Sequence, residues 1–365
     1  MLELSGDVLV FNFPHVHPRA SVRVGFQRTL RIPDDDKTYP LPPGLGNFPV
    51  RHIEDFKKRL PERWLKRGGV MVPMYQSEAL WLQFQGTYDS EREHHYPFAI
   101  KVATGKMSAL TGKPWSKKLK GKDYCVVPEQ PWLDGYVVED GLVRQFVAMP
   151  LGGGFTVEEQ LTGKAEFGGI QIEVIPMKRS EYEKRFPKVE RRPRLRMLRS
   201  MSLGSAGGGG YGTMSYSATA SASAGDAMMN MCEMDSMGLG AGGRMKQQVF
   251  DDPYGLDRWD TGHKSRCFVH LANSMMWRRI TGDEPPTVPF TAAEYRRNGM
   301  PWFDFYADAP ALEGTSKLKG VKTVKQVGKQ KGVSALPENT SLSIDPKHIH
   351  AIMSHGKQVK DGVWK

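Results

Sequence analysis

Residues 21–32 alternate between apolar and polar side chains, and this pattern constrains the fold more than any other stretch of the chain. A period of two is typical of a β-strand with one buried face. The apolar positions are Val22, Val24, Phe26, Leu30 and Ile32. Arg28 interrupts this set. Because an unpaired buried charge is very costly, we expect a strand end or bulge that lets its guanidinium reach solvent.

Short runs of the same kind recur as far as residue 177. The two clearest hairpin signals are Asp140-Gly141 and Thr104-Gly105-Lys106, each of which separates two such runs. About seven or eight short strands, with glycine and proline between them, indicate an antiparallel body. The sequence therefore predicts a β-rich α+β protein, with a sandwich- or barrel-like body and a few C-terminal helices packed on it.

Changes in composition divide the chain into four predicted segments. Residues 1–177 form the β-rich body. Residues 178–246 begin with a basic run and continue rich in glycine, alanine, serine and methionine. This stretch has too little apolar area to offset its ordering entropy, so we expect a linker or long loop. Residues 247–316 are predicted to be a helical segment that packs on the body, and residues 317–365 a basic tail.

The charge of the chain is concentrated in two of these segments. The chain carries 51 Lys and Arg against 40 Asp and Glu, for a net charge of +11. Residues 178–199 and 317–365 supply more than this excess, so the rest of the chain is near neutral. The basicity is therefore interpreted as a property of two appendages, where charge keeps a chain solvated.

Two further features concern the compartment. No run approaches the ~18 apolar residues of a membrane helix, and the N-terminal residues lack the basic and apolar regions of a signal peptide. We therefore expect a cytoplasmic protein that does not bind membranes. Cys125, Cys232 and Cys267 are far apart and form no C-x-x-C motif, so reduced thiols are expected.

The strongest candidate for a chemical site lies after the linker. Apolar residues from His263 to Thr281 recur at helical spacing, and a helix would place His263, Cys267 and His270 on one face. Imidazole and thiolate are good ligands for zinc or copper, and three protein ligands leave one position open for catalysis. The alternative is a packed helix with a buried histidine and cysteine, since free cysteine is among the most buried residue types.

Four aspartates lie just before this stretch: Asp251, Asp252, Asp257 and Asp260. Asp257 and Asp260 could orient a ligand imidazole or act as a general acid and base. The alternative interpretation is a turn followed by a helix N-terminus, whose dipole acidic residues complement.

The basic segments suggest a different function, contact with the phosphates of RNA or DNA. The candidate contacts are Arg191, Arg192, Arg194, Arg196, Lys322 and Lys325. A third basic patch at residues 117–122 lies near Trp115 and Tyr124, where single-stranded bases could stack.

Three functions remain open at this point. Many strands, no complete catalytic motif and a glycine-rich linker favour a non-enzymatic protein that associates with itself or with another protein. The first alternative is a metal-dependent or Cys/His enzyme with its site near residues 257–270. The second is nucleic-acid binding through the basic segments.

Overall fold

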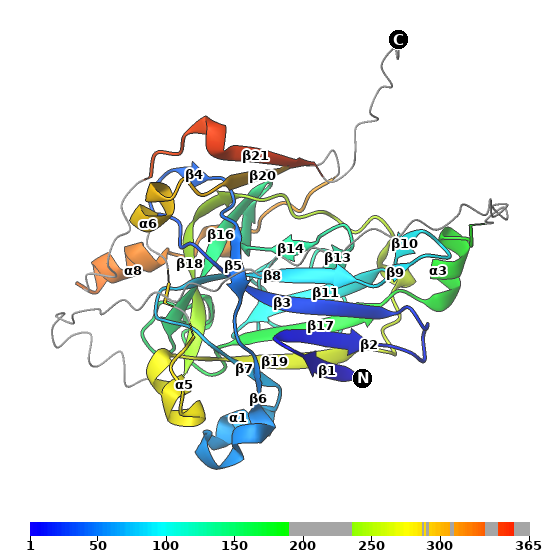
Figure 1. The fold of residues 1–365 in the computed structure, drawn as a ribbon, viewed down its shortest axis with the longest axis horizontal. Coiled ribbons are helices and arrows are strands. Elements are labelled where there is room, and N and C mark those ends of the chain that lie inside the picture. Colours follow the sequence, from blue (N-terminus) through cyan, green and yellow to red (C-terminus); the bar gives the residue numbers. More distant parts are fainter. Residues whose placement is uncertain (190–235, 287, 290–291, 307–309, 333–341, 354–365) are drawn as a thin grey trace, which may run out of the picture.

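The computed structural model describes residues 1–189, 236–286, 288–289, 292–306, 310–332 and 342–353. A single sheet of 17 strands dominates these residues, and a few helices lie at its ends (Figure 1). Most strand pairs are antiparallel, and the sheet does not close into a barrel. The predicted β-rich α+β fold is confirmed.

The strands of this sheet are short and follow one another closely along the chain. They are β1 (Leu2–Ser5), β2 (Val8–Asn12), β3 (Ser21–Thr29), β4 (Thr38–Tyr39), β5 (Gly44–Asn47), β6 (Arg51–His52), β7 (Val70–Pro73), β8 (Ala79–Gly86), β11 (Phe98–Thr104), β12 (Met107–Ser108), β13 (Cys125–Val127), β14 (Trp132–Leu133), β15 (Gly135–Glu139), β16 (Leu142–Pro150), β17 (Ile170–Pro176), β18 (Met237–Lys246) and β19 (Ser265–Ala272). Two small sheets pair β9 (Tyr88–Asp89) with β10 (His94–His95) and β20 (Trp302–Tyr306) with β21 (Ile349–Met353).

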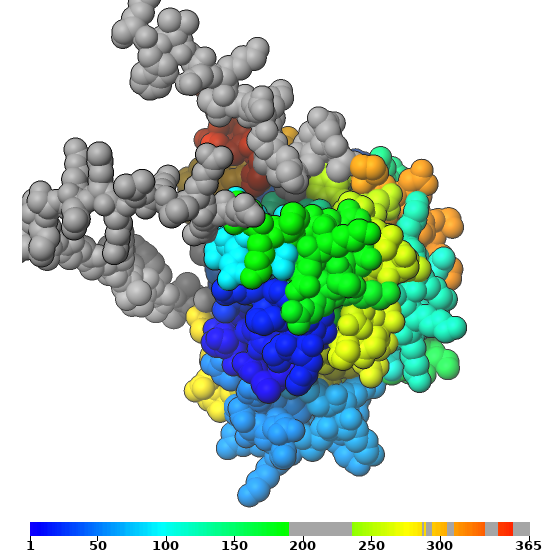
Figure 2. All heavy atoms as spheres, turned by 90° about the vertical axis from the view of Figure 1, so that its right-hand side faces the viewer, coloured from blue at the N-terminus to red at the C-terminus, as the bar shows by residue number. Residues whose placement is uncertain are grey.

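Helical segments connect or cover these strands. They are η1 (Ile53–Arg59), α1 (Glu62–Arg67), α2 (Val157–Thr162), α3 (Arg179–Arg185), η2 (Leu256–Arg258), α5 (Ser274–Thr281), α6 (Ala292–Arg297), α7 (Ser316–Lys319), α8 (Val324–Gln330) and η3 (Pro346–His348). Figure 2 shows α3, in green, beside the dark-blue N-terminal strands, and the η1–α1 segment, in light blue, projecting from the body. No helix in the described part of the chain is both long and apolar enough to span a bilayer.

The sheet has two runs of paired strands that share one core. One run is β1–β2–β3–β8–β16–β18, and the other is β7–β19–β17–β11–β13. The pairing of Met237 with Leu271 joins them. Alternate residues of both runs, such as Val24 in β3 and Ile172 in β17, belong to one buried cluster, so the other face of β11, β17 and β19 points away from this core.

The two predicted hairpins are present. Gly141 has a φ of 67° between β15 and β16, and Gly105 and Lys106 have φ values of 54° and 59° between β11 and β12. Positive φ at both loop residues of the second hairpin matches the twist of the flanking strands, and Gly adopts it without strain.

Arg28 departs from its expectation. Its side chain is only 6% exposed, and its Nε donates to Glu78 Oε1 at 3.4 Å. The expected bulge lies between Gln27 and Thr29 in the pairing with β5, but it does not bring the guanidinium to solvent. Burial raises the pKa of Glu78 to about 7, while Arg28 opposes this shift. A buried ion pair therefore replaces the solvent contact.

The predicted linker ends earlier than residue 246. Residues 190–235 lie outside the described residues, as do the four arginine candidates at 191–196, but β18 is a buried strand paired with β16 along its whole length. Glycine is required at several positions of β18, because neighbouring atoms lie too close to leave room for a side chain. A Cβ at Gly243 would lie 2.1 Å from Pro33 O, and one at Gly242 2.6 Å from Val147 Cγ2. Low complexity here reflects close packing.

The predicted basic tail also begins within the folded body. Leu318 in α7 and Val324 and Val327 in α8 are buried, and the two valines pack with Val147 and Phe155. Residues 316–330 therefore extend the core, and the predicted boundary at residue 317 is wrong in this part of the chain.

Asp134 provides a test of the buried polar structure. It lies between β14 and β15, is 2% exposed, and accepts a hydrogen bond from Gln247 Nε2 at 2.7 Å. Burial raises its pKa to about 7, and the Gln247 hydrogen bond opposes this. Between about pH 4 and 7 the unfolded chain therefore carries the carboxylate while the folded chain carries the neutral acid, so stability falls as the pH rises.

We expect Asp134→Asn to remove this dependence. The original chain loses stability between pH 4 and pH 8 and the variant does not. The difference in free energy of unfolding, variant minus original chain, should therefore rise by about 1–3 kcal/mol over this range. Urea unfolding at both pH values measures the change. Asp140→Asn, at an exposed carboxylate, is the matched control and should show a much smaller change. If the variant and the original chain differed in free energy of unfolding by the same amount at pH 4 and at pH 8, the raised pKa of Asp134 would be contradicted.

Candidate functional site

The predicted metal-binding face does not form. Residues 265–272 are strand β19, and the helix α5 begins only at Ser274. In a strand, residues 267 and 270 point to opposite faces. Cys267 joins the core cluster, whereas His270 lies on the outer face of β19. Both faces of β19 carry apolar residues, which hid the period of two and imitated helical spacing.

His270 has a structural environment. Its ring stacks between Trp64 of α1 and Phe268, with centroid distances of 4.4 Å to each. Its Nε2 lies 3.0 Å from Gly68 O, to which a neutral imidazole donates. Burial lowers the pKa of His270 to about 3. The side chain therefore fastens α1 to the sheet.

The other predicted site residues do not converge with Cys267 and His270, although Asp260 contacts His263 as the sequence suggested. Burial raises the pKa of Cys267 to about 12, so its thiol stays protonated. His263 is exposed and pairs with Asp260 at 2.9 Å, and Asp257 lies 3.7 Å from Arg258. Within the described ranges, no group of three or more His, Cys, Asp or Glu residues could hold a metal ion.

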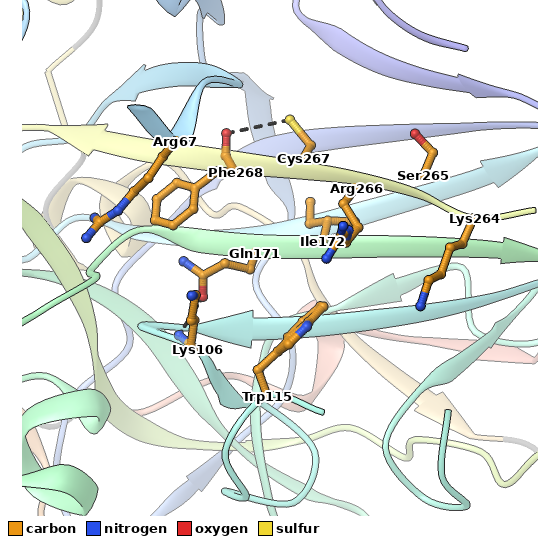
Figure 3. Close-up of a pocket in the computed structure, with 10 residues that line it drawn as sticks. All are labelled: Arg67, Lys106, Trp115, Gln171, Ile172, Lys264, Ser265, Arg266, Cys267 and Phe268. Carbon is orange, nitrogen blue, oxygen red and sulfur yellow. Dashed lines mark hydrogen bonds between the residues drawn. The ribbon is translucent and has the colours of Figure 1, made fainter. Parts of the chain in front are cut away.

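A different site lies on the outer face of β17 and β19. A hollow of about 520 Å³ lies there, which we call the large hollow. Figure 3 shows the side chains that line it. Its ten lining residues come from α1, the β11–β12 hairpin, the following loop, β17 and β19. They include four cations, Arg67, Lys106, Lys264 and Arg266, and none of the ten is acidic. This arrangement attracts anions.

A row of charged side chains crosses the sheet beside this hollow. Strand register places Lys101 of β11, Glu173 of β17 and Arg266 of β19 directly opposite one another. Glu173 is fully buried, and its oxygens lie 3.9 Å from Lys101 Nζ, 3.6 Å from Lys264 Nζ and 3.8 Å from Arg266 Nε. One carboxylate thus supports three cations, two of which line the large hollow.

Lys101 is held from several sides. It is 2% exposed, donates to Ser116 O at 2.5 Å and lies 3.7 Å from Asp123. Its ammonium also sits 4.3 Å from the centre of the Trp115 ring. Burial lowers the pKa of Lys101, and Asp123 and Glu173 oppose that shift. These contacts fix the indole of Trp115 at the wall of the large hollow.

The opposite wall is equally well fixed. Arg67 donates to Phe167 O at 3.0 Å and to Glu166 O at 2.8 Å, and its guanidinium lies 5.3 Å from the Phe268 ring centre. Lys106 Nζ lies 4.1 Å from the ring centre of Phe167. Cations held in place before binding lose less freedom when an anion arrives.

Figure 3 also shows which residues face the large hollow. Arg266 and Phe268 lie on its side of β19, whereas Ser265 and Cys267 point the other way. The Cys267 side chain therefore points away from the large hollow, and its sulfur is not available to a ligand there.

The sequence interpretation identified only part of this site. Trp115 was noted beside the basic patch at residues 117–122, and Lys117 O accepts a hydrogen bond from Lys264 Nζ at 3.0 Å. The sequence places Lys106 in the Thr104-Gly105-Lys106 hairpin, and the Thr-Gly-Lys tripeptide does not fit a phosphate-binding loop. Tyr124 is buried against Asp252 and does not line the hollow. One sequence pattern does indicate this site: the polar residues Gln171 and Glu173 alternate with apolar core residues along β17.

The remaining nucleic-acid candidates lie elsewhere. Lys322 lines a second basic hollow near α7 and α8, and the backbone N–H of Lys325 donates to Asp34 Oδ2 at 2.9 Å.

The chain matches no family model, curated protein or solved structure. The function is therefore argued from the geometry and charge of the large hollow.

Proposed function

We propose that the protein binds a nucleotide unit, either free or within a single strand, in the large hollow. The observation that carries this proposal is the set of four lining cations, Arg67, Lys106, Lys264 and Arg266, with no acidic lining residue. Such a set neutralises a phosphate group.

The aromatic side chains support the base as part of the ligand. Trp115 and Phe268 line the large hollow together with these cations. Indole and phenyl rings stack on any base without reading its sequence. Gln171 also lines the large hollow, and its amide is engaged within the protein: Oε1 accepts from the backbone N–H of Lys106 at 2.6 Å, and Nε2 donates to Gly168 O at 2.9 Å. The large hollow therefore offers cations for a phosphate and aromatic rings for a base.

The proposal differs from the sequence-based predictions. The sequence predicts nucleic-acid binding through two basic segments and a patch at residues 117–122 near Trp115, whereas the proposed site lies on the folded sheet beside that patch. Action through association with itself or another protein concerns other surfaces and stays a prediction.

Binding of adenosine 5′-monophosphate tests the proposal. At ~50 mM salt, calorimetry should detect AMP binding, weaker binding of inorganic phosphate, and the weakest binding for adenosine. Lys106→Gln and Arg266→Gln should each weaken AMP binding by about 5–20-fold, since each removes one charged contact of roughly 1–2 kcal/mol.

The control is Lys58→Gln, an exposed lysine of η1 that does not line the large hollow. It should leave AMP affinity unchanged. The proposal fails if AMP does not bind, or if the control loses as much affinity as the two site variants.

A further inference from the structure

A second, smaller hollow adjoins the large one. It has a volume of about 220 Å³, and it shares Lys106 and Trp115 with the large hollow. Met107, Pro114 and Phe167 also line it. Three apolar side chains and an indole therefore form part of the wall of this small hollow.

The two carboxylates of this small hollow are already engaged. Glu158 of α2 is 3% exposed and accepts the backbone N–H groups of residues 166, 167 and 168 at 2.7–3.0 Å. Glu166 pairs with Lys164 at 3.5 Å. Their charge is therefore compensated locally, and the small hollow offers mainly aromatic and apolar contacts to a ligand.

A third hollow, of about 430 Å³, lies on the other side of α2, and we call it the α7–α8 hollow. Its described lining residues include Lys317, Lys322 and Lys331 and no acidic residue. Glu158 and Thr162 of α2 line the small hollow, whereas Gln160 and Leu161 of the same helix line this one.

The loop after β12 brings these parts together. A Cβ placed on Gly112 would lie 3.0 Å from Leu318 Cγ and 3.2 Å from Lys317 Cβ. The same loop supplies Pro114 and Trp115 to the small hollow. The large and small hollows therefore meet at Lys106 and Trp115, and α2 separates the small hollow from the α7–α8 hollow, so a basic, an aromatic and a second basic surface neighbour one another.

We infer that this order accommodates a single-stranded nucleic acid, with a phosphate in the large hollow, a base in the small hollow and later phosphates in the α7–α8 hollow. This inference rests on the proposed function of the large hollow and extends it. A strand alternates phosphates and bases, so it can satisfy all three surfaces, whereas a free nucleotide satisfies at most two. The α7–α8 hollow thereby acquires a role that a mononucleotide does not require.

Oligothymidylates of increasing length test the inference. Binding of dTMP, dT4, dT8 and dT12 is measured at ~50 mM salt, by calorimetry or by competition against labelled dT12. We expect affinity to rise at least tenfold from dTMP to dT12. Lys322→Ala/Lys331→Ala should weaken dT12 binding by about 5–20-fold and leave dTMP binding unchanged.

Salt dependence provides an independent readout. Each lost phosphate contact should lower the slope of log K against log salt by about 0.7, so the double variant should lose about 1.4 from the dT12 slope. The charge-matched control is Lys37→Ala/Lys347→Ala, two exposed lysines that line none of the three hollows. It should bind dT12 as the original chain does.

The outcomes separate the two proposals. If dTMP binds and dT12 binds no more tightly, the strand inference is overturned and the nucleotide site stands. If dT12 binds more tightly but Lys322→Ala/Lys331→Ala does not weaken it, the assigned path over the α7–α8 hollow is overturned. If neither ligand binds, the proposed function itself fails.

Discussion

Replacing Glu173 by alanine is expected to lower the free energy of unfolding by about 3–5 kcal/mol. Glu173 is fully buried between three cations, and Lys101, the most buried of them, would keep only Asp123 as a counterion. A buried ammonium that loses one of its two carboxylate partners costs more than a lost surface pair. Urea unfolding followed by circular dichroism at pH 7 measures the loss.

Two further variants show whether charge is the cause. Lys101→Met/Glu173→Gln removes the buried charge along with its counterion and should recover a large part of the stability. Glu91→Ala is the surface control. The Glu91–Lys188 pair is closer, at 2.7 Å, but both side chains are exposed, so no measurable change is expected. A Glu173→Ala variant as stable as the original chain would refute the electrostatic role of this row.

Replacing Glu158 by alanine should cost about 2–4 kcal/mol, because it leaves the three backbone N–H groups of residues 166–168 without their acceptor. The same loop carries Phe167, which contacts Lys106 and Arg67 at the large hollow. We therefore expect weaker AMP binding together with the lower stability, measured by urea unfolding and calorimetry.

Glu166→Ala is the matched control for this loop. The Glu166 side chain is about half exposed, and its carboxylate lies 3.5 Å from Lys164 Nζ. Its removal should cost less than about 1 kcal/mol. If the two alanine variants behaved alike, the hydrogen bonds of Glu158 would not be what fixes the loop.

Local patterns were sufficient where the structure is decided locally. The hairpins at Gly105-Lys106 and Asp140-Gly141 depend on the φ values of two adjacent residues, so the sequence alone predicts them. The capping box of Thr156 and Glu159 likewise depends on two residues that lie three positions apart in the chain.

Patterns failed where tertiary neighbours decide. The glycines of β18 resemble a linker, but a Cβ at Gly240 would lie 2.8 Å from Phe155 O, a contact between distant parts of the chain. In β19, Phe268 and His270 are covered by α1, so both faces are apolar and a helix seemed the better interpretation.

The candidate site could not be predicted from charge along the sequence. Arg67, Lys106, Lys264 and Arg266 belong to distant segments, and the basic stretches around Arg67 and Lys106 do not reveal that these four cations meet. The pairing of β11, β17 and β19 places Lys106, Lys264 and Arg266 near one another, and α1 adds Arg67. The buried Glu173 compensates part of the charge of Lys264 and Arg266.

The late position of β18 and β19 in the chain has a consequence for biosynthesis. β16 and β17 end at residues 150 and 176. Each pairs along one edge with a later strand, β18 or β19, and these end at residues 246 and 272. At translation rates of about 5–20 residues per second, β17 waits roughly 5–20 s for β19 to be synthesised. During that interval the nascent chain exposes unpaired strand edges, which are prone to aggregation. The synthesis of β18 and β19 therefore determines when these strand edges are covered and can no longer pair with other chains.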